Sequence, residues 1–402
     1  MNSKNHFSLL IIFIICCLPL PFFVSNIFYF ILIIYSLFYA VKNRIKPNFS
    51  TYFFVFFAFY LLMILSYLWT IDKELTVAGI VQKSAFLLLP IVFSIIPKFN
   101  YQETNKIFRY FSFSTSFFAL FFIGNGVLHF YNSGSSENLF NHQLVSPLNL
   151  NRIYVSLFTV VAIFHLVYNE SNSLVNKLLL ILLSIFLLLL SSKTIIITTI
   201  LIFLILGHKE ILSITVKNKI FFSSLFLVMA IFYTKHNPKF YTELIPKKFK
   251  EVFEKEDFQN NYYFNGSELR MLYTRFLYEF EKEEDILFTG FGLNATQKKI
   301  QEKCLQYKIP KSYGIEFNFH NQYNQILAEI GVFGLMLLIS ILFLGFKEFI
   351  KQNDKFSIAI LIVFTALFIT ESLLNRQRGI YFFIIIYLVL FNSKRFLINA
   401  KK

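Results

Sequence analysis

The sequence predicts an all-α integral membrane protein with about twelve transmembrane helices and one large periplasmic (extracytoplasmic) loop. The 402 residues are 56% hydrophobic, include 55 phenylalanines and are 15% charged, too few charges to cover a soluble core of this size. Apolar runs close to the roughly 20 residues that cross a bilayer recur along nearly the whole chain. The net charge of +15 gathers in short connectors, which is the positive-inside pattern and not a nucleic-acid-binding stripe.

Residues 1–234 are expected to hold nine spans. The first follows a Lys4 flank, and we interpret it as a retained signal-anchor helix because further spans follow at once. The run Leu174–Leu206 is too long for one crossing at 1.5 Å per residue, so Ser191–Lys193 should separate two short helices. The nine spans are Phe7–Val24, Asn26–Val41, Thr51–Trp69, Val81–Ile96 (with Pro90), Ile107–Phe130, one starting at Arg152, the two in Leu174–Leu206, and Ile220–Tyr233.

Residues 235–322 form the large hydrophilic loop, and residues 323–402 carry three more spans and a basic tail. Loop charges alternate consistently with this count, which places the loop outside and both termini in the cytoplasm. An amphipathic helix is predicted inside the loop, with Ser267 as its N-cap. Its apolar stripe is Leu269, Leu272, Tyr273, Phe276, Leu277 and Phe280, and the last three spans are Ile326–Phe346, Ile358–Leu374 and Ile380–Phe391.

The catalytic motifs that the sequence lacks argue against several kinds of activity. The chain has no P-loop, HExxH or G-x-S-x-G motif, which argues against ATP-driven transport by this chain alone, zinc proteolysis and ordinary serine hydrolysis. Cys16 and Cys17 lie in the first span and Cys304 stands alone in the loop, so a disulfide within the loop is impossible and no metal spacing exists. No metal and no cofactor are expected.

His320 is the first candidate for chemistry, because it joins the polar loop to the span Ile326–Phe346. The positive end of the helix dipole disfavours an imidazolium there, and a neutral ring can accept a proton from a hydroxyl nucleophile. The alternative is a loop histidine hydrogen-bonded to solvent or backbone.

Several cations are candidates for binding a diphosphate. Lys193 lies between two apolar helices, Arg270 begins the amphipathic helix, and Arg376 and Arg378 form a basic turn against the positive-inside bias. Lys193 could instead snorkel to the interface, and an exposed Arg270 could simply be solvated. Gly290 and Gly292 form a weak motif for which a glycine-supported turn is the default interpretation.

Separated motifs then carry a family resemblance over Leu65–Phe383. They are LSYLWTIDKE with the Lys83–Pro90 stretch, LLLLSSKTIII, GSELRMLYTR, TGFGLN, FHNQYNQILAEIGVFGL and TESLLNRQRGIYFF. In these motifs the chain resembles the O-antigen ligase and polymerase family of bacterial envelope glycosyltransferases. The most specific motif is His-Asn ahead of a Glu-x-Gly-x-x-Gly-Leu span, after a long outer loop.

The resemblance implies an enzyme of the bacterial inner membrane that is metal-independent and inverting. It would take a glycan from polyprenyl diphosphate and pass it to lipid A–core in a ligase, or to another lipid-linked repeat unit in a polymerase. Membrane lipids are its other expected partners, and no nucleic acid is expected. The family's base falls on His320 and its diphosphate-binding arginine on Arg270, with Asn321, Gly290 and Gly292 as further binding candidates.

Two positions depart from the family pattern. Lys193 stands where the family has an arginine before its Thr-rich span, and lysine lacks the bidentate fork of a guanidinium. Asn151-Arg152 replaces the frequent His-Pro start of the sixth span, so Arg152 is a candidate for the missing guanidinium.

Three alternatives stay open at the level of sequence. A polymerase is not separated from a ligase. A lipid-linked oligosaccharide flippase or secondary transporter would be expected to carry charges within several spans, and most spans here have none. A cell-wall polymerase of the shape-elongation-division type would use a catalytic carboxylate, for which no outer aspartate stands in a clear motif.

Overall fold

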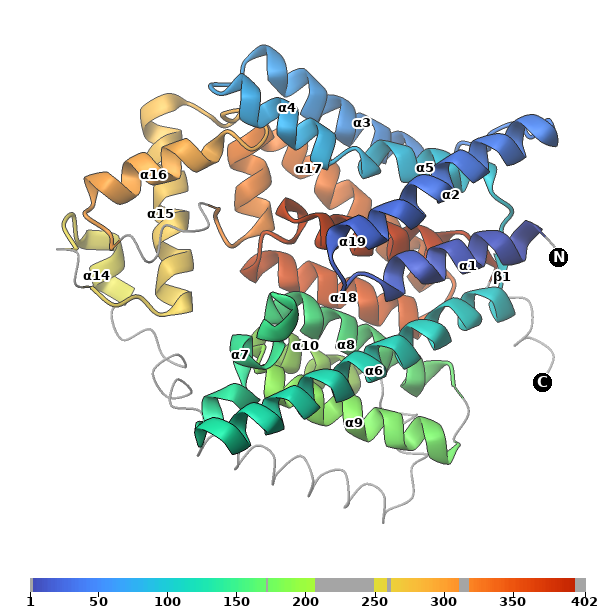
Figure 1. Cartoon of the computed structure of the whole chain (residues 1–402). Coiled ribbons are helices and arrows are strands. Elements are labelled where there is room, and N and C mark those ends of the chain that lie inside the picture. The colour runs from blue at the N-terminus through green and yellow to red at the C-terminus, as the bar shows by residue number, and fades with distance from the viewer. Residues whose placement is uncertain (1–2, 171–172, 207–248, 259–261, 311–317, 395–402) are drawn as a thin grey trace.

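The computed structural model describes residues 3–170, 173–206, 249–258, 262–310 and 318–394, which form a bundle of helices with a smaller helical group at one end (Figure 1). A parallel pair of two-residue strands, β1 (Phe99–Asn100) and β2 (Ser393–Lys394), ties the start of α6 to the end of α19. The helices of the bundle are α1 (Ser3–Cys16), α2 (Phe22–Lys42), α3 (Thr51–Leu65), α4 (Lys73–Gln82), α5 (Ala85–Ile95), α6 (Tyr101–Ser133), α7 (Asn141–Val145), α8 (Arg152–Tyr168), α9 (Leu174–Leu190), α10 (Lys193–Ile205), α17 (Gln322–Lys351), α18 (Lys355–Thr370) and α19 (Gln377–Phe391).

The described part of the chain has five helical stretches long and apolar enough to cross a membrane. They are Phe22–Lys42, Thr51–Leu68, Lys73–Ile95, Tyr101–Ser133 and Gln322–Lys351. A sixth would be the pair Asn141–Leu148 and Arg152–Tyr168, bent by 90°, and five shorter apolar helices accompany them. The chain is therefore an integral membrane protein; twelve spans are not confirmed, and Ile220–Tyr233 lies outside the described residues.

The predicted division of Leu174–Leu206 is confirmed. Helix α9 ends at Leu190, Ser191 adopts a left-handed φ of 57°, and α10 starts at Lys193. The sequence missed a second break, at Lys83 and Ser84, where α4 ends and α5 starts. Polar residues thus interrupt the apolar helices at both breaks.

The smaller group is formed by α14 (Phe249–Glu254), α15 (Gly266–Glu284) and α16 (Thr296–Gln306). It lies at the end of the bundle opposite to the start of α1 (Figure 1). The predicted amphipathic helix is α15, and its stripe residues Leu272, Tyr273, Phe276, Leu277 and Phe280 are buried in the group's own core. Its N-cap is not Ser267. Asn265 accepts hydrogen bonds from the N–H groups of Ser267 and Glu268 and completes a capping box with Glu268.

Helix α17 is broken inside the bundle, at Ile330 and Gly331. The break frees the carbonyl groups of Ala328 and Glu329, which accept hydrogen bonds from the N–H groups of Phe291 (2.8 Å) and Gly292 (2.9 Å). A side chain at Gly331 (φ 69°) would lie 2.1 Å from the carbonyl oxygen of Phe288. The loop after α15 therefore packs directly against the backbone of α17 at its break.

Replacing Gly331 by alanine should destabilise the protein. The positive φ alone costs about 1–3 kcal/mol for a residue with a Cβ, and the clash with Phe288 adds to it. We expect Gly331→Ala to lower the melting temperature in detergent. Gly124→Ala on α6 is the matched control, because nothing lies within 4 Å of a Cβ there. Equal melting temperatures for Gly331→Ala and the unaltered protein would contradict the close packing described above.

Candidate functional site

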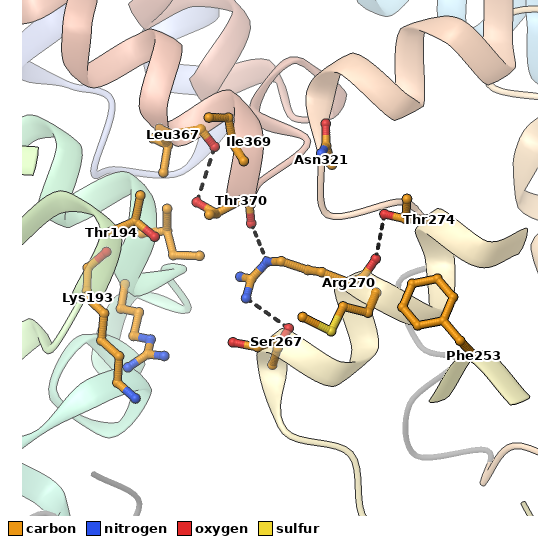
Figure 2. Close-up of a pocket in the computed structure, with 15 residues that line it drawn as sticks. Lys193, Thr194, Phe253, Ser267, Arg270, Thr274, Asn321, Leu367, Ile369 and Thr370 are labelled. Atoms are coloured by element: carbon orange, nitrogen blue, oxygen red, sulfur yellow. Dashed lines mark hydrogen bonds between the residues drawn. The ribbon is translucent and has the colours of Figure 1, made fainter. Parts of the chain in front are cut away.

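A cavity of about 460 Å³ opens where the N-terminal ends of α8, α10, α15 and α17 meet the C-terminal end of α18 (Figure 2). It brings together four residues predicted from the sequence, Arg152, Lys193, Arg270 and Asn321. The other residues that line it are Ile153, Ser192, Thr194, Phe253, Gly266, Ser267, Met271, Thr274, Leu367, Ile369 and Thr370. We call this space the cationic cavity.

Arg270 lies on one side of the cationic cavity and is held by backbone carbonyl groups. Its Nε donates to the carbonyl oxygen of Thr370 (2.8 Å), and its Nη1 donates to that of Gly266 (2.9 Å). The first bond joins the smaller helical group to the end of α18, as Figure 2 shows. Arg270 is thus part-buried at the boundary between the two parts of the fold, with its guanidinium in the cavity wall.

Arg152 and Lys193 lie on adjacent helices at the other side. Arg152 donates from Nη1 to the side-chain oxygen of Asn141 and to the carbonyl oxygen of Ser191 (3.3 Å). Ser191 belongs to the left-handed turn that leads into Lys193, so this bond connects the two cationic residues. The structure therefore places a guanidinium from α8 beside Lys193 at the start of α10.

His320 lies directly beside the cationic cavity rather than in its lining. Its ring stacks on Tyr273 of α15, with centroids 6.0 Å apart, and its Nδ1 lies 3.7 Å from Oε2 of Glu371. Asn321 and Thr370, the chain neighbours of this histidine and this glutamate, both line the cavity. His320 has 23% of its side chain exposed and Glu371 has 6%, so the pair is part-sheltered from solvent.

Sequence reasoning missed Glu371. The signal was a carboxylate inside the otherwise uncharged expected span Ile358–Leu374, in the TESLLNRQRG motif. In the structure α18 ends at Thr370, and Glu371 has an extended backbone just beyond it. Because the helix ends there, the carboxylate of Glu371 lies next to the loop that carries His320.

Arg376 and Arg378 are not brought to the cationic cavity. They line a second cavity of about 270 Å³ with Phe22, His142, Asn151 and Tyr154 among others. Arg378 donates to the carbonyl oxygens of Leu18 (2.8 Å) and Leu20 (3.0 Å) and lies over the ring of Phe22. Helix α8 contributes to both cavities, because Arg152 and Ile153 line the first and Tyr154, Val155 and Phe158 line the second.

Gly290 and Gly292 line neither of these cavities. Both have positive φ values, 64° and 101°. A Cβ at Gly290 would lie 2.4 Å from the carbonyl carbon of Glu329, and one at Gly292 would lie 2.1 Å from the hydroxyl oxygen of Thr70. Their close packing on α17 and on the connection before α4 that contains Thr70 accounts for the two glycines, in agreement with the glycine-supported turn expected by default.

An ionic cluster behind the cavity holds α15 against α16. Arg275 Nε and Lys303 Nζ contact the carboxylate of Glu279 at 2.8 and 3.1 Å, and the Tyr307 hydroxyl donates to it at 2.8 Å. Burial opposes ionisation of Glu279, but these hydrogen bonds outweigh it and lower the pKa of its carboxyl group. The helix that carries Arg270 is therefore fixed through its opposite face by charges that persist at neutral pH.

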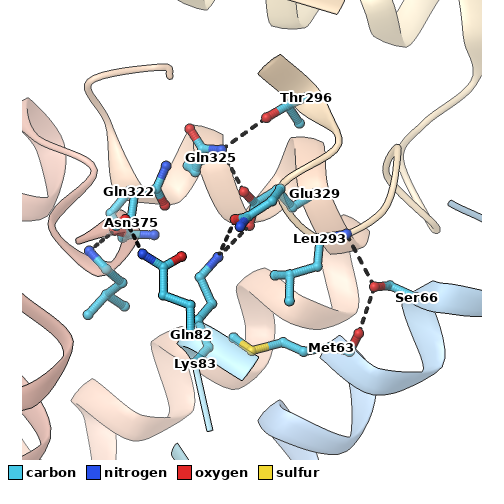
Figure 3. Close-up of polar contacts among 12 residues, drawn as sticks. Met63, Ser66, Gln82, Lys83, Leu293, Thr296, Gln322, Gln325, Glu329 and Asn375 are labelled. Carbon is cyan, nitrogen blue, oxygen red and sulfur yellow. Dashed lines mark hydrogen bonds and ion pairs between the residues drawn. The ribbon is translucent and has the colours of Figure 1, made fainter. Parts of the chain in front are cut away.

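A buried ion pair, which the sequence did not reveal, lies near the break in α17 (Figure 3). Lys83 Nζ lies 3.0 Å from Oε2 of Glu329, and both side chains are fully buried. These residues fall in two of the spans expected from the sequence. A low content of charge in the spans argues against a transporter, and this buried pair is an exception to it in two of the expected spans.

Comparison with known proteins supports the resemblance seen in the sequence. A family model described as O-Antigen ligase matches residues 178–339. The match runs from α9 through Lys193, Arg270 and His320 into α17. A search of curated proteins found no match. The resemblance to the O-antigen ligase family is thus confirmed over residues 178–339.

Proposed function

Because residues 178–339 match the O-Antigen ligase family, we propose that this membrane protein transfers a glycan from polyprenyl diphosphate to an acceptor hydroxyl. The reaction would take place on the outer side of the bacterial inner membrane, with both termini of the chain in the cytoplasm. The observation that carries the proposal is the convergence of Arg152, Lys193 and Arg270 on one cavity beside His320 and Glu371.

The electrostatics of the cationic cavity favour a diphosphate. Arg152 and Lys193 are the first residues of α8 and α10, and Arg270 lies in the second turn of α15. Helix N-termini already carry partial positive charge and normally favour anionic side chains. Several positive helix ends and three cations facing one space therefore repel each other, and a bound diphosphate would relieve that repulsion.

His320 would act as the general base. Its ring accepts the proton of the acceptor hydroxyl as that oxygen attacks C1 of the donor sugar. The bond from C1 to the phosphate oxygen breaks, and polyprenyl diphosphate leaves with the electron pair, stabilised by the cations of the cavity. Glu371 stabilises the imidazolium that forms, and attack from the face opposite the leaving group inverts the anomeric carbon.

Replacing His320 should abolish transfer while the protein still folds and inserts. General-base catalysis contributes about 10²–10⁴-fold, so His320→Ala should lose at least that much activity, and Glu371→Gln should lose less. The measurement is glycan transfer by purified protein with polyprenyl-diphosphate-linked donor and acceptor. His129→Ala, an exposed histidine on α6, is the control and should be unaffected. Full transfer by His320→Ala would exclude the assigned base.

Lys193 should be replaceable by another cation but not by a neutral side chain. Lys193→Arg should keep or improve activity, since it restores the fork that grips phosphate oxygens, whereas Lys193→Ala should lose about 10²-fold. Lys177→Ala at the far end of α9 is the control. Equal rates for the lysine, arginine and alanine forms of residue 193 would show that its charge has no part in the reaction.

Deleting the gene and running a gel of surface glycan tests the acceptor. For a ligase that uses lipid A–core, all long glycan should be lost from its lipid anchor. For a polymerase, a single repeat should stay attached. Transfer by purified protein in detergent, where no membrane has to be crossed, separates both from a lipid-linked oligosaccharide flippase. An unchanged surface glycan together with no transfer in detergent would contradict the proposed function.

A further inference from the structure

We propose that Gln325 and the buried pair Lys83–Glu329 are positioning residues, which hold the backbone that presents His320 to the acceptor. This rests on the proposed function, because it assumes that His320 is the base. The three residues come from α17 and from the junction of α4 and α5, and none of them lines the cationic cavity. Their effect on the reaction is therefore exerted through the loop in front of α17.

The residues on both sides of His320 in the chain, Phe319 and Asn321, are held in place by hydrogen bonds. The N–H of Phe319 donates to Oε1 of Gln325 (3.1 Å), and the Asn321 side chain caps α17 by accepting from the N–H groups of Tyr323 and Asn324. Between these anchors His320 has a left-handed φ of 44°, a conformation that costs free energy and persists only where surrounding contacts impose it. The N–H of His320 itself donates to Oδ1 of Asn318 (2.8 Å). Gln325 supplies the anchor at Phe319 from a fully enclosed position in the first turn of α17.

The orientation of the Gln325 amide is set by Glu329. Nε2 of Gln325 donates to Oε1 of Glu329 (2.7 Å) and to Oγ1 of Thr296 (3.0 Å). An ionised carboxylate has no proton to donate, so the amide must turn its NH₂ group towards Glu329. Its oxygen then faces the N–H of Phe319. The reverse orientation would place two donors against each other in a buried site.

Lys83 is the charged partner of Glu329. A buried carboxylate is costly unless it is paired, and Nζ of Lys83 lies 3.0 Å from Oε2 of Glu329. Nζ also donates to Oδ1 of Asn294 (3.2 Å), in the loop between α15 and α16. Figure 3 shows the resulting chain of contacts from Lys83 through Glu329 to Gln325 and Thr296. The charge pair thereby fixes an amide, and the amide fixes the residue before His320.

Two sets of variants test the proposal without leaving a single buried charge. Gln325→Met removes the amide and keeps an elongated side chain. The double variant Lys83→Met/Glu329→Met removes both charges, a change that is often neutral for stability. Tyr387→Phe is the matched control, because its hydroxyl donates to the carbonyl oxygen of Ile341 in the buried part of α17 beyond the break.

Full-length proteins in detergent would be assayed with donor and acceptor glycolipids extracted from a deletion strain, and binding of undecaprenyl diphosphate would be measured separately. A base displaced by about 1 Å loses on the order of 10²-fold in rate. We expect kcat to fall by about 10–100-fold in Gln325→Met and in the double variant. The KM for the donor and the affinity for undecaprenyl diphosphate should stay within about twofold, because the cationic cavity is intact.

Two results would overturn the positioning role. One is a kcat in both folded variants no lower than that of Tyr387→Phe. The other is a parallel loss of diphosphate affinity and kcat, which would indicate a general structural role. Should one of the two variants fail to fold, the other decides. If the unaltered protein binds undecaprenyl diphosphate but transfers no glycan, the proposed function itself is refuted. In that case the unaltered protein is inactive, whereas a failure of the positioning role alone leaves the unaltered protein active.

Discussion

The break in α17 is the constraint on which the rest of this structure depends. A helix interrupted inside an apolar bundle exposes carbonyl groups that must find donors within the protein. Here the N–H groups of Phe291 and Gly292 satisfy the carbonyl groups of Ala328 and Glu329. Because those donors belong to the loop after α15, satisfying the broken helix also docks the smaller helical group on the bundle.

The docking of the smaller helical group on the bundle determines which side chains line the cationic cavity together. Arg270 lies in the docked group, whereas Arg152 and Lys193 lie in the bundle, so a cavity lined by all three requires both parts. The bond from Arg270 to the carbonyl oxygen of Thr370 makes the junction specific, and Thr370 immediately precedes Glu371. The same junction therefore places a cation at the cavity and a carboxylate at His320.

Patterns along one segment could be predicted from the sequence, and contacts between segments could not. The stripe of α15 and the break at Ser191–Lys193 follow from spacing and polarity within short stretches, and both were predicted correctly. The predicted N-cap Ser267 was wrong, because the register of α15 makes Asn265 the N-cap. The pairs Lys83–Glu329 and His320–Glu371 join distant segments, so neither partner identifies the other in a linear sequence. The resemblance to a family, and not spacing, is the source of the roles predicted for His320 and Arg270.

The charges around the cationic cavity also bear on turnover in the proposed reaction. Breaking the bond to C1 converts a diphosphate diester into a terminal diphosphate, which carries an additional ionisable oxygen. The cations that stabilise this developing charge consequently bind the product more tightly than the substrate. Lysine at position 193 contributes a strongly hydrated point charge in place of a fork, so in the proposed reaction it stabilises the leaving group less strongly than the arginine of Lys193→Arg would.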